Sequence, residues 1–494
     1  MKTLMSQSIF NSNTCRILLA TCLSALCLIA LSTQAATITV TNTNDSGAGS
    51  LRQALADAYN GDTIDFGVTG TITLTTGELL VDKNVTISGP GAAILAVDAN
   101  HASRAFHVSR WITATIAGLS ITNGTAEGDG GGGIHNDHAT LAIDNCMVSG
   151  NHAAWGGGVH NDGSNSSATL TVTNSTFSGN SVAAPYGVGS GGGIYNDGFD
   201  GSATLTVTNS TFSGNSAGIV GAYGIGGGIC NDGPFGSATL TLSNSTFSGN
   251  WAGYVGGGIY NGSAMVTIRG TILNAGASGE NLYNSSGTVS SLGYNLSNDN
   301  GGGFLAATGD QINIDPLLGP LQDNGGPTFT HELLSGSPAI DAGDPSFTAP
   351  PYYDQRGPGY DRVANSHIDI GAFEVQIVTP SYSGQVQPPI NTDGTSTFSI
   401  RRGIVPIRFT LTRGGVATCD LPSATIAVTR TAGGVAGQVN ESVYSGNADT
   451  GSNFRIDSCQ YVYNLNSRAL GAGTYRVDML IDGQVVGSAV FALN

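Results

Sequence analysis

Short segments of the chain alternate apolar and polar residues with the two-residue period of a β-strand. In the segment 168–173, Leu170 and Val172 point to one side of an extended strand, and the threonines beside them point to the other. Turns rich in Gly, Asn and Ser separate these segments, and no helical periodicity lies between them. The pattern therefore predicts an all-β chain built from many short strands.

Two motifs repeat along the chain. The first reads GGGIHND in its first copy, and its copies begin at Gly131, Gly156, Gly191, Gly226 and Gly256. The second reads TNSTFSGN at Thr173 and Thr208, with variants that begin at Asp144 and Ser243. Repeats of this length indicate coils that bury a common core by stacking on one another. We predict a parallel β-helix over residues 36–330, closed by the segment 331–376.

Stacking places equivalent residues of successive coils at the inter-strand spacing of about 4.8 Å. It predicts an internal stack of Phe177, Phe212 and Phe247, and a ladder of amide side chains that satisfies backbone groups at the turns. The ladder comprises Asn180, Asn215 and Asn250. The variable repeat length predicts loops at one corner, over 181–190 and 216–225.

Two segments near the N-terminus depart from the strand pattern. Residues 1–35 resemble a secretory signal peptide, with an apolar run from Ile17 to Leu31, a length that is short for a membrane span. A lipoprotein anchor at Cys22 or Cys27 is the alternative. Residues 51–58 predict an amphipathic helix with Ser50 as N-cap, which we expect to cover the first coil.

Composition narrows the class of function. Only 10% of the residues are charged and 74 of 494 are Gly, which argues against a helical bundle. The net charge of −17 argues against nucleic-acid binding, since phosphate contacts need clustered Lys and Arg. Residues 36–380 hold 27 acidic and seven basic side chains, whereas 381–494 hold seven and eight. This change predicts a domain boundary.

The GGGI and Phe-x-x-Asn repeats resemble those of polymorphic outer-membrane proteins. The resemblance implies the right-handed, single-stranded, pectin-lyase-like class of β-helix. Segments that follow the repeats resemble the "choice-of-anchor" region of bacterial surface proteins: Asp315–Leu318, Asn324–Pro327, Gly336–Gly343, Asp354–Gly357 and Asp369–Glu374. Both likenesses imply an exported or cell-surface bacterial protein, but a fold does not specify an activity.

The C-terminal region reads as a separate small domain. Residues 377–395 are predicted to be a linker, and 396–494 a β-sandwich with strands near 395–412, 424–431, 454–465, 474–481 and 485–493. Val405–Phe409 resembles the signature of an exported module named for Pro-x-Lys-Phe, with Arg408 in the Lys place. In an exported protein, Cys419 and Cys459 are expected to form a disulfide. Cys146 and Cys230 lie on different coils and are expected to stay unpaired.

No set of residues in the sequence predicts a catalytic site. A lyase needs carboxylates clustered with Arg or Lys, yet the regular repeats from Gly130 to Asn250 contain neither Arg nor Lys. The acidic β-helix would also repel a polyanionic substrate. We expect no cofactor. The alternative is a polysaccharide lyase or glycosidase, which a cleft holding both carboxylates and Arg would favour.

Three outward columns are candidates for ligand contact. The first contains His135, His160, Tyr195, Cys230 and Tyr260, and it is suited to stacking against sugar rings or, with His138 and His152, to binding a transition metal. Plain exposed strand positions are the simpler interpretation. The second contains Asp137, Asp162, Asp197 and Asp232, which predict turn capping, with calcium binding as the alternative.

The third column set is threonine-rich, at 169/171/173, 204/206/208 and 239/241/243. Ranked threonines resemble ice-binding surfaces, but Thr is also a common exposed strand residue. Taken together, the sequence predicts a secreted or cell-surface protein without a transmembrane helix. We expect it to act as a non-catalytic adhesin or scaffold, with extracellular glycans or surface proteins as partners.

Overall fold

The computed structural model describes residues 35–494 except 184–187, 219–222, 275, 277, 366, 377–381, 440–448, 450 and 482. The chain divides into two compact units, Met1–Gln376 and Ile377–Asn494. The predicted signal peptide, residues 1–35, lies outside the described residues apart from Ala35. None of the described helices is long and apolar enough to cross a membrane.

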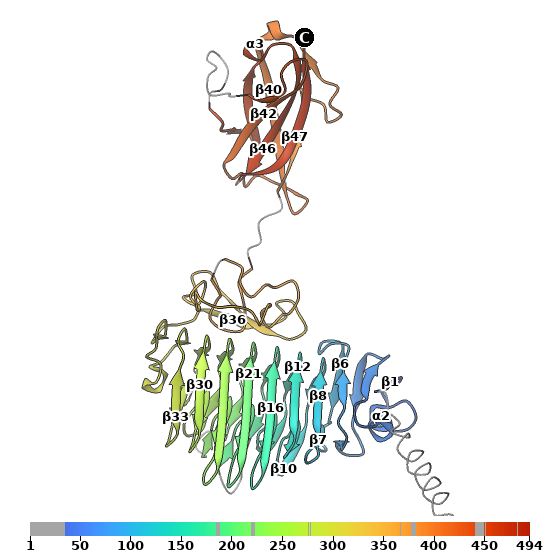
Figure 1. Ribbon diagram of the computed structural model, residues 1–494, viewed down its shortest axis with the longest axis vertical. Coiled ribbons are helices and arrows are strands. Elements are labelled where there is room, and N and C mark those ends of the chain that lie inside the picture. Colours follow the sequence, from blue (N-terminus) through green and yellow to red (C-terminus); the bar gives the residue numbers. More distant parts are fainter. Residues whose placement is uncertain are drawn as a thin grey trace, which may run out of the picture. The chain divides into compact units, whose positions relative to one another are not determined.

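The first unit is a parallel β-helix (Figure 1). Three long parallel sheets, A, B and C, run along it, and each regular coil contributes one strand to C, then A, then B. Sheet A contains β1 (Thr37–Val40), β2 (Thr63–Phe66), β5 (Thr86–Ser88), β8 (Thr113–Ala117), β12 (Thr140–Asp144), β16 (Ser167–Thr173), β21 (Ser202–Thr208), β26 (Ser237–Ser243), β30 (Met265–Arg269) and β33 (Thr288–Ser291).

The other two long sheets follow the same stacking order. Sheet B contains β3 (Gly70–Thr73), β6 (Leu95–Asp98), β9 (Ser120–Thr122), β13 (Met147–Ser149), β17 (Thr176–Ser178), β22 (Thr211–Ser213), β27 (Thr246–Ser248), β31 (Ile272–Asn274), β34 (Leu296–Ser297) and β35 (Gln311–Ile312). Sheet C contains β4 (Leu79–Val81), β7 (Phe106–Val108), β11 (Ile134–Asp137), β15 (Val159–Asp162), β20 (Ile194–Asp197), β25 (Ile229–Asp232), β29 (Ile259–Asn261) and β32 (Leu282–Asn284).

The corner between sheets B and C differs from the prediction. The segments predicted as loops, 181–190 and 216–225, carry short strands of a fourth parallel sheet, D. Sheet D contains β10 (Thr125–Gly130), β14 (His152–Trp155), β18 (Ser181–Val182), β19 (Gly189–Ser190), β23 (Ser216–Ala217), β24 (Gly224–Ile225) and β28 (Trp251–Ala252). The strands within the two predicted loops are two residues long, which is too short to show a period in the sequence.

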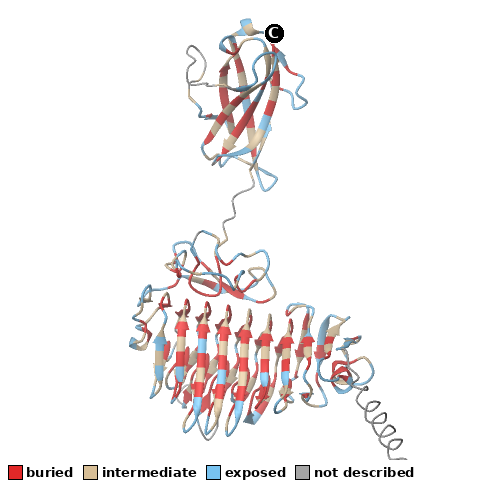
Figure 2. Cartoon of the chain, viewed as in Figure 1, coloured by how far each residue is buried: buried red, intermediate tan, exposed pale blue. Residues whose placement is uncertain are grey.

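Inward residues of the strands form one continuous core (Figure 2). Phe177, Phe212 and Phe247 stack in it with ring centroids 4.8 and 4.7 Å apart, as predicted. Cys146 and Cys230 are buried and unpaired, also as predicted. The core therefore repeats the same side chains from coil to coil at the spacing of the strands.

Buried asparagines connect the coils at the turn after sheet B. The predicted ladder is confirmed: the Asn215 side chain donates to Asn250 Oδ1 at 2.9 Å and to the Phe177 carbonyl at 2.9 Å. It also accepts from the backbone N–H of Asn180 at 3.1 Å. The ladder begins one coil earlier than predicted, at Asn151. A second ladder inside sheet C, which the sequence did not predict, connects Asn136, Asn161, Asn196, Asn231, Asn261 and Asn284.

Helix α2 (Leu51–Asp57) covers the first coil. The Ser50 side chain accepts a hydrogen bond from the Gln53 backbone N–H, which confirms the predicted N-cap. Leu51, Ala54 and Leu55 are buried, and the helix packs on β1 and β4. An apolar helix face thereby shields the open end of the core.

The closing segment packs on the outer face of sheet B. The antiparallel pair β36 (Leu318–Gln322) and β37 (Thr330–Leu333) leads into this segment, whereas η1 (Gly301–Gly303) lies earlier, between β34 and β35, and contacts β32 of sheet C. Gln355 accepts from the Thr211 hydroxyl at 2.6 Å and donates to Thr176 Oγ1 at 2.9 Å. The segments 354–357 and 369–374 meet here: Arg356 pairs with Asp354 at 2.6 Å, and burial raises the pKa of Glu374 to about 8. Gln355 therefore makes a buried polar contact between the closing segment and the coils, beside a buried ion pair within the segment.

The second unit consists of two sheets whose strands pair almost entirely antiparallel. One contains β38 (Tyr382–Val386), β40 (Ile404–Arg413), β41 (Val416–Thr418), β44 (Arg455–Asp457) and β45 (Gln460–Asn466). The other contains β39 (Thr397–Phe398), β42 (Ala424–Ala432), β43 (Gly437–Val439), β46 (Gly473–Ile481) and β47 (Gln484–Leu493), and the unit adds η2 (Ile400–Arg402) and α3 (Ser467–Leu470). This is the predicted β-sandwich-like region, with its own buried core.

Two details of this unit differ from the prediction. The segment 377–395, predicted as a linker, contains β38, which pairs with β40 along five residues. The strand predicted for 395–412 is broken by η2 and by Gly403, whose φ of 88° a non-glycine residue rarely adopts. Pairing partners distant in sequence decide both features, so local pattern did not show them.

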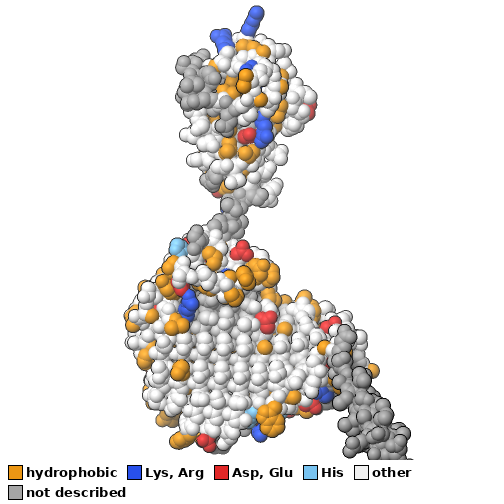
Figure 3. Space-filling view, viewed as in Figure 1, with side chains coloured by type: hydrophobic (Ala, Val, Ile, Leu, Met, Phe, Trp, Pro, Cys, Tyr) orange, Lys and Arg blue, Asp and Glu red, His pale blue; other side chains and the backbone are white. Residues whose placement is uncertain are grey.

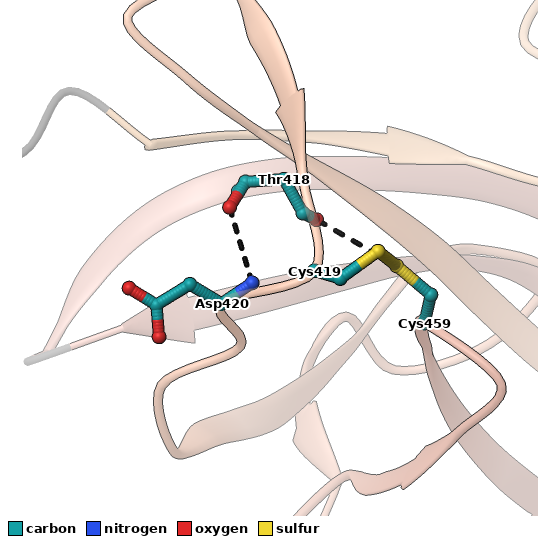
Figure 4. Close-up of a disulfide and its surroundings, with 4 residues drawn as sticks. All are labelled: Thr418, Cys419, Asp420 and Cys459. Carbon is teal, nitrogen blue, oxygen red and sulfur yellow. Dashed lines mark hydrogen bonds between the residues drawn. A yellow bond between two sulfur atoms is a disulfide. The ribbon is translucent and has the colours of Figure 1, made fainter.

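The predicted disulfide between Cys419 and Cys459 is present (Figure 4). It closes a loop of 40 residues between β41 and the turn that precedes β45. On the loop-entropy estimate, a closed loop of this length stabilises the folded unit by roughly 4 kcal/mol.

The Asn ladder predicts the outcome of one substitution. Asn215→Ala removes its side-chain amide, so that the Asn180 N–H loses its acceptor and the Phe177 carbonyl loses a side-chain donor in the core. We expect the free energy of unfolding to fall by about 3 kcal/mol in denaturant titrations. Asn274→Ala is the control, because that outward side chain makes one long contact of 3.5 Å. Equal losses for the two variants would contradict a structural role for the ladder.

Candidate functional site

The first candidate column follows the outer face of sheet C. Strand pairing places His135 beside His160, His160 beside Tyr195, and Cys230 beside Tyr260. At the triple-glycine turns the backbone packs so closely that a Cβ on one of these glycines would meet neighbouring backbone atoms. Only glycine allows this close packing, which keeps successive coils in the same register. The structure extends the column by His107 at one end and Tyr283 at the other. Seven consecutive coils therefore contribute to it.

The rings of this column stack. His107, His135, His160 and Tyr195 have successive centroid distances of 5.2 Å. Tyr260 and Tyr283 form a second stack at 5.9 Å, and Cys230 separates the two groups. Parallel strands in register hold the rings at about the strand spacing, which is the distance for offset stacking.

Burial divides the column into two parts. His135 and His160 are 9% and 6% exposed, and Cys230 is fully buried. Gly130 of β10 packs so closely on His160 that a Cβ there would lie 2.0 Å from Nδ1. Tyr195, Tyr260 and Tyr283 are half-buried. The tyrosines are therefore partly exposed on the surface, whereas the two histidines proposed as contacts from sequence are buried.

Each histidine also faces an aspartate of the next coil. Nε2 of His135 lies 3.4 Å from Asp162 Oδ2, and Nε2 of His160 lies 3.6 Å from Asp197 Oδ2. Burial opposes ionisation of Asp162, but hydrogen bonds from His135 and Ser164 hold its pKa well below the usual range. The His135–Asp162 hydrogen bond therefore joins two neighbouring coils on the outside, whereas the ring nitrogens of His160 make no hydrogen bond.

The sequence did not predict the charged cluster at the start of the column. Arg104 contacts Glu78 at 2.9 Å and Asp129, and its guanidinium lies 2.6 Å from His135 Nδ1. Glu78 also contacts His107 at 3.1 Å, which raises the pKa of His107. The coils that carry Glu78, Arg104 and His107 lack the GGGI motif. In the sequence, only the apolar–His–apolar pattern of 106–108 could have indicated this cluster.

The contact with Arg104 fixes the protonation state of His135. A guanidinium can only donate, so Nδ1 accepts, and the hydrogen on Nε2 is donated to Asp162. Burial, together with the neighbouring positive charges, lowers the pKa of His135. His135 is therefore a neutral member of the stack.

The same geometry disfavours a transition-metal ion. His135, His160 and Asp162 offer atoms within 4.8 Å of one another, but the ring planes of the two histidines lie within 9° of parallel. Lone pairs of parallel rings do not converge on one ion, and the hydrogen on His135 Nε2 blocks that atom. His138 contacts Asp137 and the Ser164 carbonyl through its two ring nitrogens, and His152 lies in sheet D.

The aspartate column caps turns. Asp162 accepts from the Ser164 backbone N–H at 3.0 Å, and Asp197 accepts from that of Phe199 at 2.9 Å. Asp232 accepts from Ser263 of the next coil, and burial raises its pKa. The bonds of Asp162 and Asp197 match the predicted Asx turns, whereas Asp232 bonds to the next coil and Asp137 contacts Arg110 and His138 instead. Calcium binding by Asp137, Asp162, Asp197 and Asp232 stays a prediction.

A groove of about 630 Å³ lies between the coils and the closing segment. Thr173, Thr208 and Ser243, from three successive coils, line one side. Phe347 and Pro350 line the other, and Arg269, paired with Asp344, is also part of the lining. The volume is within the usual range of ligand pockets, and hydroxyl groups dominate its polar lining. The sequence did not indicate the groove, because its sides are more than 70 residues apart.

No protein-family model matches the sequence, and no curated protein shows a significant match to it. The likeness to polymorphic outer-membrane proteins therefore rests on the repeat motifs themselves.

The neutral state of His135 predicts a pH effect. Its folded-state pKa is lowered, so acidification protonates the unfolded chain first, and the stability due to His135 is lost as pH falls through the unfolded value near 6.5. The His135→Phe variant lacks this proton uptake. We expect the difference in unfolding free energy, wild type minus variant, to decrease between pH 7 and pH 5 in denaturant titrations. A difference that is constant or increases would contradict the assignment.

Proposed function

We propose that this protein is an extracellular or cell-surface adhesin or scaffold of a bacterium, and that its β-helix presents binding surfaces for glycans. The sequence supports export through its signal-like N-terminus, and the Cys419–Cys459 disulfide is in keeping with an oxidising compartment. Attachment to an outer membrane or release from the cell are both compatible with this proposal.

The groove beside the closing segment carries the proposal. Hydroxyls of Thr208 and Ser243, 3.1 Å apart, belong to one column that repeats at the strand spacing of about 4.8 Å. Such a row can exchange hydrogen bonds with the hydroxyls of an extended sugar chain. Phe347 offers an apolar ring surface on the other side, which suits the C–H face of a sugar.

The tyrosine end of the sheet C column is a second contact surface. Tyr260 and Tyr283 are stacked and half-buried, so their rings are already ordered before a ligand arrives. Tyr223 and Tyr254, 67% and 60% exposed, form an edge-to-face pair 5.6 Å apart. Pre-ordered aromatic side chains bind with a small loss of conformational entropy.

One observation favours the alternative, a polysaccharide-active enzyme. The Arg104 cluster brings Glu78 and Asp129 together with a cation and two histidines, which is the combination a lyase or glycosidase needs. However, each of these charges already has a partner within the cluster, and Arg104 is only 10% exposed. We therefore assign the cluster a structural role, in which its ion pairs hold the first coils together, and not a catalytic one.

The test combines a panel of neutral and acidic polysaccharides with two readouts, binding and release of shorter products. We expect binding without product release. Thr208→Trp fills the groove and should weaken binding at least tenfold, and Thr429→Trp, on an outward position of β42, is its control. Tyr260→Ala with Tyr283→Ala tests the second surface, with Tyr59→Ala as control.

The outcomes separate the hypotheses. Binding that both site variants leave unchanged would contradict glycan contact through these surfaces. Product release that disappears in Arg104→Gln would instead establish the enzyme.

A further inference from the structure

The outer face of sheet A forms a two-dimensional array of threonines that extends well beyond the three coils visible in sequence. Two adjacent outward columns run through β8, β12, β16, β21, β26, β30 and β33 in unbroken register. One column contains Thr113, Thr140, Thr169, Thr204, Thr239, Met265 and Thr288. The other contains Thr115, Ala142, Thr171, Thr206, Thr241, Thr267 and Ser290.

The array has fixed spacings in both directions. Successive coils repeat at about 4.8 Å, and the two columns are two residues apart along each strand, about 6.6–6.8 Å. None of the pairings from β8 to β33 contains a bulge or register shift. Since β-branched side chains have few rotamers, the methyl and hydroxyl groups hold these spacings rigidly.

The hydroxyls of this array are free to bond outside the protein. Within the described residues, those of Thr169, Thr171, Thr204, Thr206, Thr239 and Thr241 make no hydrogen bond to protein groups. Hydroxyls outside the two columns are engaged: in the third outward column of sheet A, Thr173 donates to Asp144 and Thr208 bonds to Ser243, and on sheet B Thr176 donates to the Phe329 carbonyl. The two columns of the array therefore have unused hydrogen-bonding capacity in a periodic arrangement, unlike the third column of sheet A and unlike sheet B.

The array is also uncharged. Neither column contains an ionisable side chain, although the protein carries a net charge of −17. Figure 3 shows the middle of this face as rows of uncharged polar side chains and backbone, with charged groups near its margins. An ionised side chain holds water in its own hydration geometry, which is incompatible with the neutral lattice of ice. The absence of charge on this face therefore suits it to contact with the uncharged surface of ice.

We propose that the threonine array of sheet A binds ice. A rigid lattice of water repeats in two directions, so all the hydroxyls and methyls of the array can engage it simultaneously, whereas a flexible chain follows one row. The methyl groups supply apolar contact between rows, and each hydroxyl both donates and accepts. Because the coils are rigidly stacked, binding requires little ordering of the protein. The inference does not depend on the glycan groove.

The test uses the purified protein in three ice assays: thermal hysteresis, inhibition of ice recrystallisation, and partition into a slowly growing ice front. Thr206→Tyr places a ring at the centre of the array, at a strand position where Tyr is favourable. We expect wild type to be active in all three assays and Thr206→Tyr to lose at least tenfold of that activity. Thr429→Tyr, on β42 of the second unit, should retain full activity.

Two further measurements keep the result interpretable. Circular dichroism melting should show that Thr206→Tyr folds as wild type does, and Thr206→Val, which keeps the shape but removes one hydroxyl, should lose activity partially. Wild type that is inactive in ice assays, or Thr206→Tyr that keeps wild-type activity, would overturn the proposal. Glycan binding should be the same in all these variants, so failure here is distinct from failure of the adhesin proposal.

Discussion

The hydrogen bonds between buried asparagines of successive coils are the interaction on which the rest of the β-helix depends. A turn between parallel strands leaves backbone groups inside the molecule that the sheets do not pair. The backbone N–H groups of Asn180 and Asn215 are such groups, and each donates to the side-chain oxygen of the asparagine in the next coil. The side-chain amides of Asn180 and Asn215 donate in turn to that same oxygen and to a carbonyl of the previous coil. A shift of one coil by a single residue would break every such bond and reverse the inward side chains of its strands. The ladder therefore fixes the register.

A fixed register also determines the outer surface. Once each coil repeats its neighbour, any outward residue that recurs in the sequence becomes a column at the strand spacing. On sheet C this gives a column in which His135 and His160 are buried and the tyrosines are half-buried. On sheet A it gives an uncharged array of threonines. The same constraint thus yields a structural contact on one sheet and potential binding surfaces on others.

The regular repeats made much of this predictable. Phe177 and Asn215 could be placed because identical motifs recur and a coil has one inside. Contacts between dissimilar segments could not be placed: Gln355 reaches Thr176 across 179 residues, and the two share no pattern. The same is true of Arg104 and Glu78, which lie in coils without the glycine motif. Burial of His135 was missed because a strand period gives the side of a sheet but not what covers it.

Residue-level hydrogen–deuterium exchange on the folded protein tests the central claim most directly. The backbone N–H groups of Asn151, Asn180 and Asn215 each donate to an asparagine oxygen of the next coil, at 3.0 to 3.1 Å. Although these groups lie in turns, the account predicts that they exchange as slowly as the strand amides of Phe177 and Phe212. Exchange at the rate of exposed turns, with the strand amides still protected, would contradict the ladder as the element that sets the register.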